Sequence, residues 1–225
     1  MASICGTLEA LEWENRFFGT NSSRVLFSDN AGSLTASELD KWSLVQAKIS
    51  ASRTDLLEGL QASGFQFVEG EIDFSLPVSS AGAAVSFDVA KPQDIDTLRE
   101  QAAGVFRQSR FRTPWYQPGD SGRFYAQWVE NAVRGTFDNQ CLLLRQGEKI
   151  RGFVTLRQLG GEEARIGLLA GKGVGQTLIS LAQAWCQQRG VKRLRIATQI
   201  GNSAALRLYM QPGATIESTA FWLYR

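Results

Sequence analysis

Residues 165–209 carry the most informative pattern in the chain: RIGLLAGKGVGQTLISLAQAWCQQRGVKRLRIATQIGNSAALRLY. The segment reads as a strand, a glycine-rich loop, an amphipathic helix, a second strand and a second helix. Gly171, Gly173 and Gly175 stand between the first strand and the helix, so successive backbone N–H groups are exposed at the positive end of that helix. This arrangement predicts a binding site for an anion such as a pyrophosphate.

The second helix adds two polar side chains that we expect to share a face. Asn202 stands at the expected N-cap, and Tyr209 follows about two turns later, roughly 10.5 Å along a helix. A diphosphate-binding loop beside an Asn and a Tyr predicts an enzyme that binds coenzyme A. The alternative is that the glycines only form a tight turn, which leaves the Asn/Tyr spacing unexplained.

Two other families of glycine-rich loop fit less well. A Walker A loop requires Lys and then Ser or Thr after its last glycine, whereas Gln176 follows Gly175. A dinucleotide fingerprint that starts at Gly171 would need its third glycine at position 176. It would also need an acidic residue where the chain has Arg193 and Arg195.

The composition limits the chemistry. With 225 residues, 44% hydrophobic and 20% charged, the chain predicts a globular protein of one large or two modest domains. A net charge of +2 gives no footprint for nucleic acid or a membrane surface. The absence of histidine excludes His-dependent nucleophiles, His-ligated zinc and a histidine base, and we expect no metal. Three separated cysteines and the lack of a signal-like or membrane-spanning run predict a cytoplasmic protein.

Two parts are expected, a small α/β domain at 1–78 and a larger domain at 84–225, joined by a Pro/Ser/Gly/Ala-rich stretch within 76–84. In the first part we expect strands at 24–27 and 65–76 and helices at 36–50 and 54–62. In the second part, outside the opening segment, we expect helices at 94–106 and 122–133 and strands at 85–89, 140–145, 150–158 and 216–225.

Two of these elements show a clear hydrophobic pattern. The helix at 36–50 would bury four apolar residues: Leu39, Trp42, Val45 and Ile49. The strand at 65–76 alternates, with core residues at even positions: Val68, Ile72, Phe74 and Leu76. Three acidic residues share its opposite face: Glu69, Glu71 and Asp73.

The glycine loop and the helix after it resemble the GNAT superfamily of acyl-CoA-dependent N-acetyltransferases. The family signature, Gln/Arg-x-x-Gly-x-Gly/Ala, corresponds to 170–175, with Ala170 in place of the usual Gln or Arg. The later Asn-x-x-Ala…Tyr…Gly pattern corresponds to Asn202, Ala205, Tyr209 and Gly213. The resemblance covers about 85–225 and implies the GNAT fold, an α/β (α+β) fold whose mixed, mostly antiparallel sheet is flanked by helices.

Longer motifs over the whole chain resemble nucleotide-sugar N-acetyltransferases of this superfamily. They are WENRFFG at 13–19, FVEGEIDF at 67–74, SRFR at 109–112 and RFYAQWVENAVRGTFDNQC at 123–141. This resemblance implies transfer to the 4-amino group of dTDP-4-amino-4,6-dideoxy-D-galactose, for synthesis of the enterobacterial common antigen. It also implies a homodimer, for which the aromatic residues of the last strand offer a surface: Phe221, Trp222 and Tyr224.

The resemblance and the residue types assign roles. Tyr209 would protonate the leaving thiolate, and backbone N–H groups around 167–169 would polarise the thioester carbonyl. Glu69 is the candidate base, with a solvated polar strand face as its alternative. Acetyl-CoA would contact Leu169, Ala170, Gly171, Lys172, Gly173, Val174, Gly175, Asn202 and Leu208. The nucleotide would contact Arg110, Arg112 and Tyr116, because Arg suits phosphate and aromatic rings suit planar bases.

Other interpretations stay open from sequence. The acceptor could be another amine, such as a different amino sugar, an aminoglycoside or a protein N-terminus. A non-catalytic acyl-CoA-binding module is a further alternative, although it would not need Tyr209. A covalent route through Cys141 or Cys186 is less favoured, because both cysteines stand among apolar residues of expected core elements.

Overall fold

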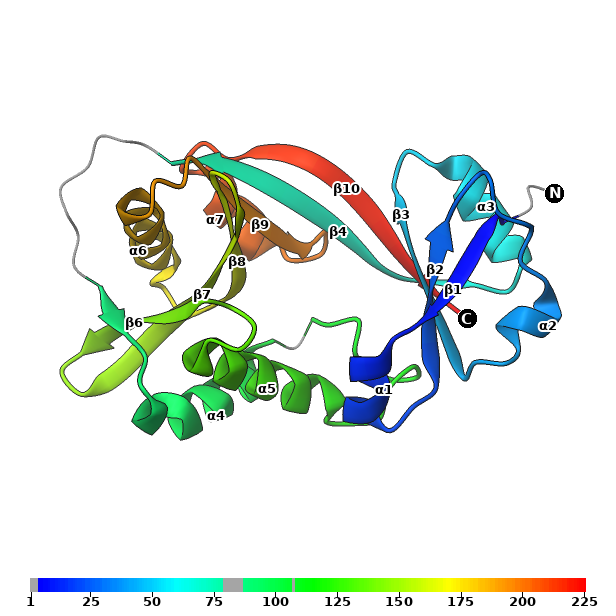
Figure 1. Cartoon of the computed structure of the whole chain (residues 1–225). Helices are drawn as coiled ribbons and strands as arrows, with labels where there is room; N and C mark the ends of the chain where they lie inside the picture. Colours follow the sequence, from blue (N-terminus) through cyan, green and yellow to red (C-terminus); the bar gives the residue numbers. More distant parts are fainter. Residues whose placement is uncertain (1–3, 79–86, 107) are drawn as a thin grey trace.

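The computed structural model describes residues 4–78, 87–106 and 108–225. A ten-stranded sheet runs through it in the order β1-β2-β3-β10-β4-β9-β8-β7-β6-β5 (Figure 1). The strands are β1 Gly6–Ala10, β2 Ser22–Phe27, β3 Leu44–Ser50, β4 Gln66–Pro77, β5 Asp88–Val89, β6 Gln140–Gln146, β7 Lys149–Gly160, β8 Glu163–Ala170, β9 Arg193–Gln199 and β10 Thr215–Tyr224. The helices are α1 Glu12–Phe18, α2 Ala36–Leu39, α3 Thr54–Ala62, the 3₁₀ turn η1 Pro92–Asp94, α4 Ile95–Val105, α5 Asp120–Arg134, α6 Gly175–Gln188 and α7 Ser203–Met210.

Most neighbouring strands are antiparallel, and the described pairs β2/β3 and β8/β9 are parallel. This is the mixed, mostly antiparallel sheet that the sequence predicted. On one face α6 packs against β6, β7 and β8, with Trp185 fully buried. α4 and α5 pack together and form a second core with β6 and β7. No helix in the described ranges is long and apolar enough to cross a membrane.

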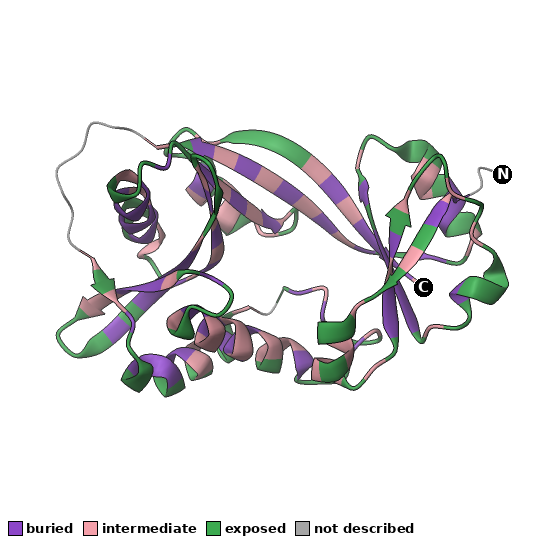
Figure 2. Ribbon diagram, viewed as in Figure 1, coloured by how far each residue is buried: buried purple, intermediate pink, exposed green. Residues whose placement is uncertain are grey.

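The long strands β4 and β10 join the two parts of the chain (Figure 1). β10 pairs with β4 along its length, and residues 220–224 also pair with β3. Buried and half-buried residues alternate along β4 (Figure 2). We retain the division into 1–78 and 84–225 as a proposal, in which the end of β10 completes the first part. The linker expected within 76–84 lies, from residue 79 on, outside the described residues.

The prediction of a single helix over 36–50 is wrong. The helix α2 stops at Leu39, after a capping box in which Thr35 accepts from the Glu38 N–H. Residues 44–50 form β3, which lies between β2 and β10. Val45 and Ile49 are buried in the core of the first part, as expected, but they lie on one face of a strand. Pairing with residues far along the chain has outweighed the local helical spacing.

The other expected helices and strands are present. The strand expected at 85–89 is described only as β5, because residues 85 and 86 lie outside the described residues. The alternation in β4 is confirmed, since its even-numbered apolar residues are buried and its three acidic residues lie half-buried on the other face.

Candidate active site

The strands β8 and β9 separate at the centre of the sheet and leave a cavity between them. Their parallel pairing runs from Glu163 to Ile166 and stops, while β8 continues to Ala170 beside β7. The side of 167–170 that faces away from β7 therefore has no described strand partner. A cavity of about 780 Å³ lies there, lined by residues of β4, β8, α5, α7 and the glycine loop.

A β-bulge lies on β8 at the cavity wall. Between its paired residues Ile166 and Leu169, β8 contains one residue more than β7 does, so Gly167 and Leu168 are bulged. A bulge re-aims backbone groups and is common beside active sites. The bulge includes the residues whose N–H groups we expected to polarise a carbonyl.

A buried network fixes this bulge. The Thr155 hydroxyl accepts from the Leu168 N–H at 2.8 Å and donates to the Asp138 carboxylate at 2.6 Å. The Trp128 indole N–H, from α5, also donates to Asp138 at 2.8 Å. Sequence reasoning missed this network: Trp128 and Asp138 lie within the 123–141 motif, but nothing in that motif indicates a contact with Thr155.

Gly167→Ala tests the bulge. A Cβ at this position would collide with the Asp138 carboxylate and lie 2.7 Å from the Thr155 hydroxyl, so the bulge must shift. We expect kcat to fall about tenfold or more and the free energy of unfolding to fall by about 1–3 kcal/mol. Thiol release and urea unfolding measure the two effects.

Gly104→Ala is the matched control, because a Cβ there meets no atom within 4 Å and the residue lies in α4. Its kcat should equal that of the wild type. A Gly167→Ala enzyme with wild-type kcat would show that the bulge geometry is not needed for turnover.

The positions of the loop require glycine for different structural reasons. A Cβ on Gly171 would lie 2.5 Å from Val174 Cγ2, and one on Gly175 would lie 2.7 Å from Leu208 Cδ2. These two glycines therefore permit close packing. Gly173 has φ +74°, in the left-handed region, and the space around it is open.

The structure brings most of the expected cofactor residues together. The cavity is lined by Leu169, Ala170, Gly171, Lys172, Gly173, Gly175, Asn202 and Leu208. Val174 is the exception, because its side chain packs against the hydrophobic core. The loop leads into the N-terminus of α6, whose first turn has no acidic residue, and Lys172 adds a positive charge. These groups fit a diphosphate.

Gly173→Val tests the loop. Valine is strained at this φ, and its side chain would stand where the backbone must approach a phosphate. We expect acetyl-CoA affinity, measured by calorimetry, to weaken at least tenfold, about 1.4 kcal/mol. Gly190→Val is the control. Gly190 also has a positive φ, +69°, and a Cβ there meets no atom within 4 Å, but the residue does not line the cavity. If both variants bind like the wild type, the loop does not hold the cofactor.

Helix α7 presents Asn202 and Tyr209 to the cavity, as the spacing predicted. The Asn202 carboxamide caps the helix by accepting from the Ala205 N–H at 3.2 Å. Tyr209 is 6% exposed and packs edge-to-face on Phe74. Its hydroxyl makes no hydrogen bond to a described residue, and burial raises its pKa to about 12. The phenol therefore keeps its proton at neutral pH.

Two carboxylates of β4, Glu69 and Glu71, also line the cavity, and their pKa values are shifted in opposite directions. Burial raises the pKa of Glu69 to about 7, with Arg110 opposing and Glu71 adding to the shift. Glu69 has no hydrogen bond or ion pair with a described residue. Burial also acts on Glu71, but bonds from Lys48 at 2.6 Å and Trp222 at 3.0 Å hold its pKa below the ordinary value. Glu69 can exchange a proton near neutrality, whereas Glu71 is a fixed anion.

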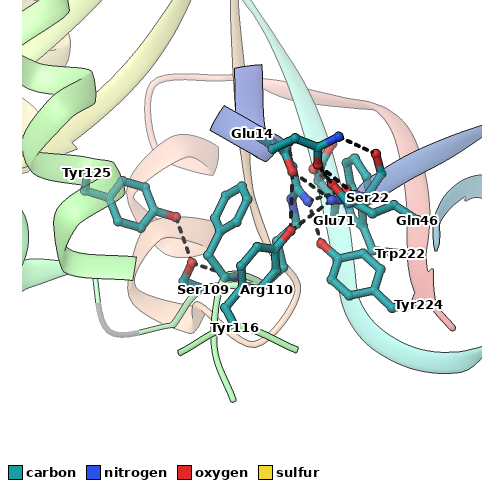
Figure 3. Close-up of polar contacts among 12 residues, drawn as sticks. Glu14, Ser22, Gln46, Glu71, Ser109, Arg110, Tyr116, Tyr125, Trp222 and Tyr224 are labelled. Atoms are coloured by element: carbon teal, nitrogen blue, oxygen red, sulfur yellow. Dashed lines mark hydrogen bonds and ion pairs between the residues drawn. The ribbon is translucent and has the colours of Figure 1, made fainter. Parts of the chain in front are cut away.

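Arg110 also lines the cavity, within a network that joins the two parts of the chain (Figure 3). It donates to Gln46 at 2.8 Å and to the Tyr224 hydroxyl, and Glu14 is 3.8 Å away. Its guanidinium stacks on Trp222 at 4.0 Å. Sequence reasoning missed the partners of this arginine, which come from three distant segments.

Arg112 and Tyr116 do not line the cavity. Arg112 donates to the backbone carbonyls of Ser109 and Val68, at 2.8 and 2.9 Å. The buried Tyr116 hydroxyl joins the Glu14–Gln46 pair of the Arg110 network. In the structure both residues hold the loop, and their contact with the nucleotide stays a prediction.

The buried cysteines offer no thiolate at this site. Cys141 and Cys186 lie outside the cavity lining, and burial raises the pKa of both thiols, that of Cys186 to about 12. No group of three or more His, Cys, Asp or Glu side chains in the described part of the chain is placed to hold a metal ion.

Comparison with known proteins agrees with this geometry. Residues 105–213 match the model of the Acetyltransferase (GNAT) family. The chain is 56% identical to a dTDP-fucosamine acetyltransferase of Escherichia coli O6:H1 (strain CFT073), over 99% of both chains. The chain belongs to the GNAT acetyltransferase family. The predicted family, fold and enzyme class are thereby confirmed.

Solved structures of GNAT proteins share the fold at low sequence identity. A GCN5-related N-acetyltransferase from Sphaerobacter thermophilus superposes with a TM-score of 0.66 at 15% identity, covering 97% of this chain and 75% of that one. One from Kribbella flavida gives 0.59 at 14% identity, covering 98% and 87%. In this GNAT chain the fold places the separated β8 and β9, the glycine loop and α7 around one cavity.

Proposed function

We propose that this enzyme transfers the acetyl group of acetyl-CoA to the 4-amino group of dTDP-fucosamine, dTDP-4-amino-4,6-dideoxy-D-galactose. The observation that carries the proposal is the 56% identity, over 99% of both chains, to a relative named for that substrate. The cavity supports it, because it is lined both by a loop suited to an anion and by a carboxylate whose pKa is raised to about 7.

The proposed reaction uses groups that face this cavity. Glu69, ionised, takes a proton from the amine directly or through water, and the neutral nitrogen attacks the thioester carbon. Backbone N–H groups of 167–169 at the β8 bulge, other than that of Leu168, which is bonded to Thr155, stabilise the oxygen that becomes negative. The C–S bond then breaks as the amide forms: Tyr209 gives its proton to the departing thiolate, and the second proton of the attacking nitrogen passes to the tyrosinate directly or through water. Holding both substrates in one cavity makes the attack effectively unimolecular.

The proposed cofactor contacts involve residues that line the same cavity. The loop from Leu169 to Gly175 would bind the diphosphate of acetyl-CoA, with Asn202 and Leu208 beside the pantetheine arm. We place the reaction in the cytoplasm and assign its product to the enterobacterial common antigen, in keeping with the substrate of the proposal.

We also propose a homodimer, but its interface must involve residues other than the buried aromatic residues of the last strand. Trp222 and Tyr224 are buried within the chain, and Phe221 packs against the core of the first part. Trp222 and Tyr224 are therefore not available to an interface, and the part of Phe221 in it stays a prediction. Light scattering at micromolar concentration should give twice the chain mass of 24.8 kDa, and a monomer would reject the dimer.

The function is tested by thiol release from acetyl-CoA with a panel of amines. The panel contains dTDP-4-amino-4,6-dideoxy-D-galactose, the same amino sugar without its nucleotide, an aminoglycoside and a peptide with a free N-terminus. We expect kcat/KM to be highest for the nucleotide sugar. Equal kcat/KM with and without the nucleotide, or preference for another amine, would overturn the substrate assignment.

A further inference from the structure

A second cavity, of about 480 Å³, lies beside the first. It is lined mainly by residues at the start of α1 and on α5, and it shares four lining residues with the first cavity: Arg110, Phe111, Phe124 and Trp128. Arg110 is the charged residue among these four, so a ligand that occupies both cavities has this cation at their shared boundary. The reaction proposed above uses the first cavity only.

Aromatic side chains line this second cavity, and two of them are unusually exposed. Trp13 is 44% exposed and Phe137 is 50% exposed, although residues of this kind are normally covered. Trp13 also meets Phe124 edge-on, with ring centroids 6.0 Å apart. Exposed rings that line a concave site suit the stacking of a planar ligand.

The polar groups of the second cavity select the kind of planar ligand. The Glu12 carboxylate is exposed and can accept a hydrogen bond, whereas Glu14 already accepts from Gln46 and Tyr116. Both carboxylates disfavour phosphate at this end. Asn131 uses its oxygen to accept from Gln127 at 2.9 Å, and its amide N–H groups donate to no described residue. A thymine or uracil base has an N–H between two carbonyls, so its edge can pair with a carboxylate acceptor and an amide donor that line the same cavity.

We infer that the second cavity binds the pyrimidine base of the nucleotide-linked acceptor, with the diphosphate beside Arg110 and the amino sugar in the first cavity. The inference rests on the proposed function and adds a base subsite to it. Arg110 is the cation at the boundary that the two cavities share, and arginine is well suited to phosphate. The base is thereby separated from the acetyl-CoA loop, which lines only the first cavity.

Binding of dTDP itself, measured by calorimetry, tests the subsite without requiring turnover. We expect the double variant Trp13→Ala/Phe137→Ala to bind dTDP at least tenfold more weakly than the wild type. Its affinity for acetyl-CoA should change less than twofold, because neither residue lines the first cavity. Phe67→Ala is the control, because Phe67 is 54% exposed and lines neither cavity, so its dTDP affinity should equal that of the wild type.

The outcomes separate the subsite from the proposed function. Equal dTDP affinity in the wild type and the double variant, or no dTDP binding by the wild type at millimolar concentration, overturns the base subsite. Absence of turnover of the nucleotide sugar by the wild type overturns the proposed function. A selective loss of dTDP affinity in the double variant, with a matching rise in KM for the nucleotide sugar, supports the subsite.

Discussion

Tyr209→Phe is expected to lower kcat by about 10² to 10⁴ and to leave acetyl-CoA affinity nearly unchanged. Tyr209 lines the cavity and its hydroxyl has no hydrogen bond to a described residue, so its proton is available to a thiolate. Phenylalanine keeps the edge-to-face contact with Phe74, whose ring centroid is 5.8 Å away. Steady-state thiol release under conditions where chemistry limits the rate, together with calorimetry, measures the two quantities.

Tyr125→Phe is the matched control for this prediction. Tyr125 is also buried and lines the same cavity, but its hydroxyl already donates to Ser109 at 3.3 Å. We expect its kcat to stay within a few-fold of the wild type. If Tyr209→Phe retains wild-type kcat, Tyr209 is a packing residue, and a large loss in Tyr125→Phe instead would transfer the proton-donor role to that side chain.

The sequence predicted those parts of the fold in which local pattern and tertiary structure agree. The glycine loop, α6 and α7 were foreseen because caps, glycine spacing and a 3.6-residue period all occur within a few turns. The strand β3 was not foreseen, because its apolar residues also fit a helix. Its place between β2 and β10 depends on residues 220–224, more than 150 positions away. A local window cannot contain that information.

The same limit applies to the candidate site. Glu69, Asn202 and Tyr209 could be chosen from sequence, because each belongs to a regular alternation or to a spaced motif. The partners of Arg110 could not be chosen, since Glu14, Gln46 and Tyr224 come from three separate elements. Asp138 and Thr155 were missed for the same reason. Their importance comes from burial beside the bulge, which only the folded chain brings about.

Glu69→Gln is expected to lower kcat/KM for the nucleotide sugar by about 10² or more, because glutamine keeps the shape of the side chain but cannot take a proton. The variant should fold normally, since the Glu69 carboxylate has no hydrogen bond or ion pair with a described residue. Glu71→Gln is the control. It weakens the bonds to Lys48 and Trp222, so it should reduce stability while leaving the general base in place.

The pH profile separates a general base from a merely polar residue. The active form of Glu69 is the carboxylate, and burial raises its pKa to about 7. Below that pH the ionised fraction falls about tenfold per unit, so kcat/KM should fall in proportion and level off above pH 7. Tyr209, with its pKa raised to about 12, adds no loss on the alkaline side near neutrality. The acidic limb should persist in Glu71→Gln and disappear in Glu69→Gln. A limb near pH 7 that survives in Glu69→Gln would show that another group, such as the amine itself, is titrating, and Glu69 would then be only part of the cavity wall.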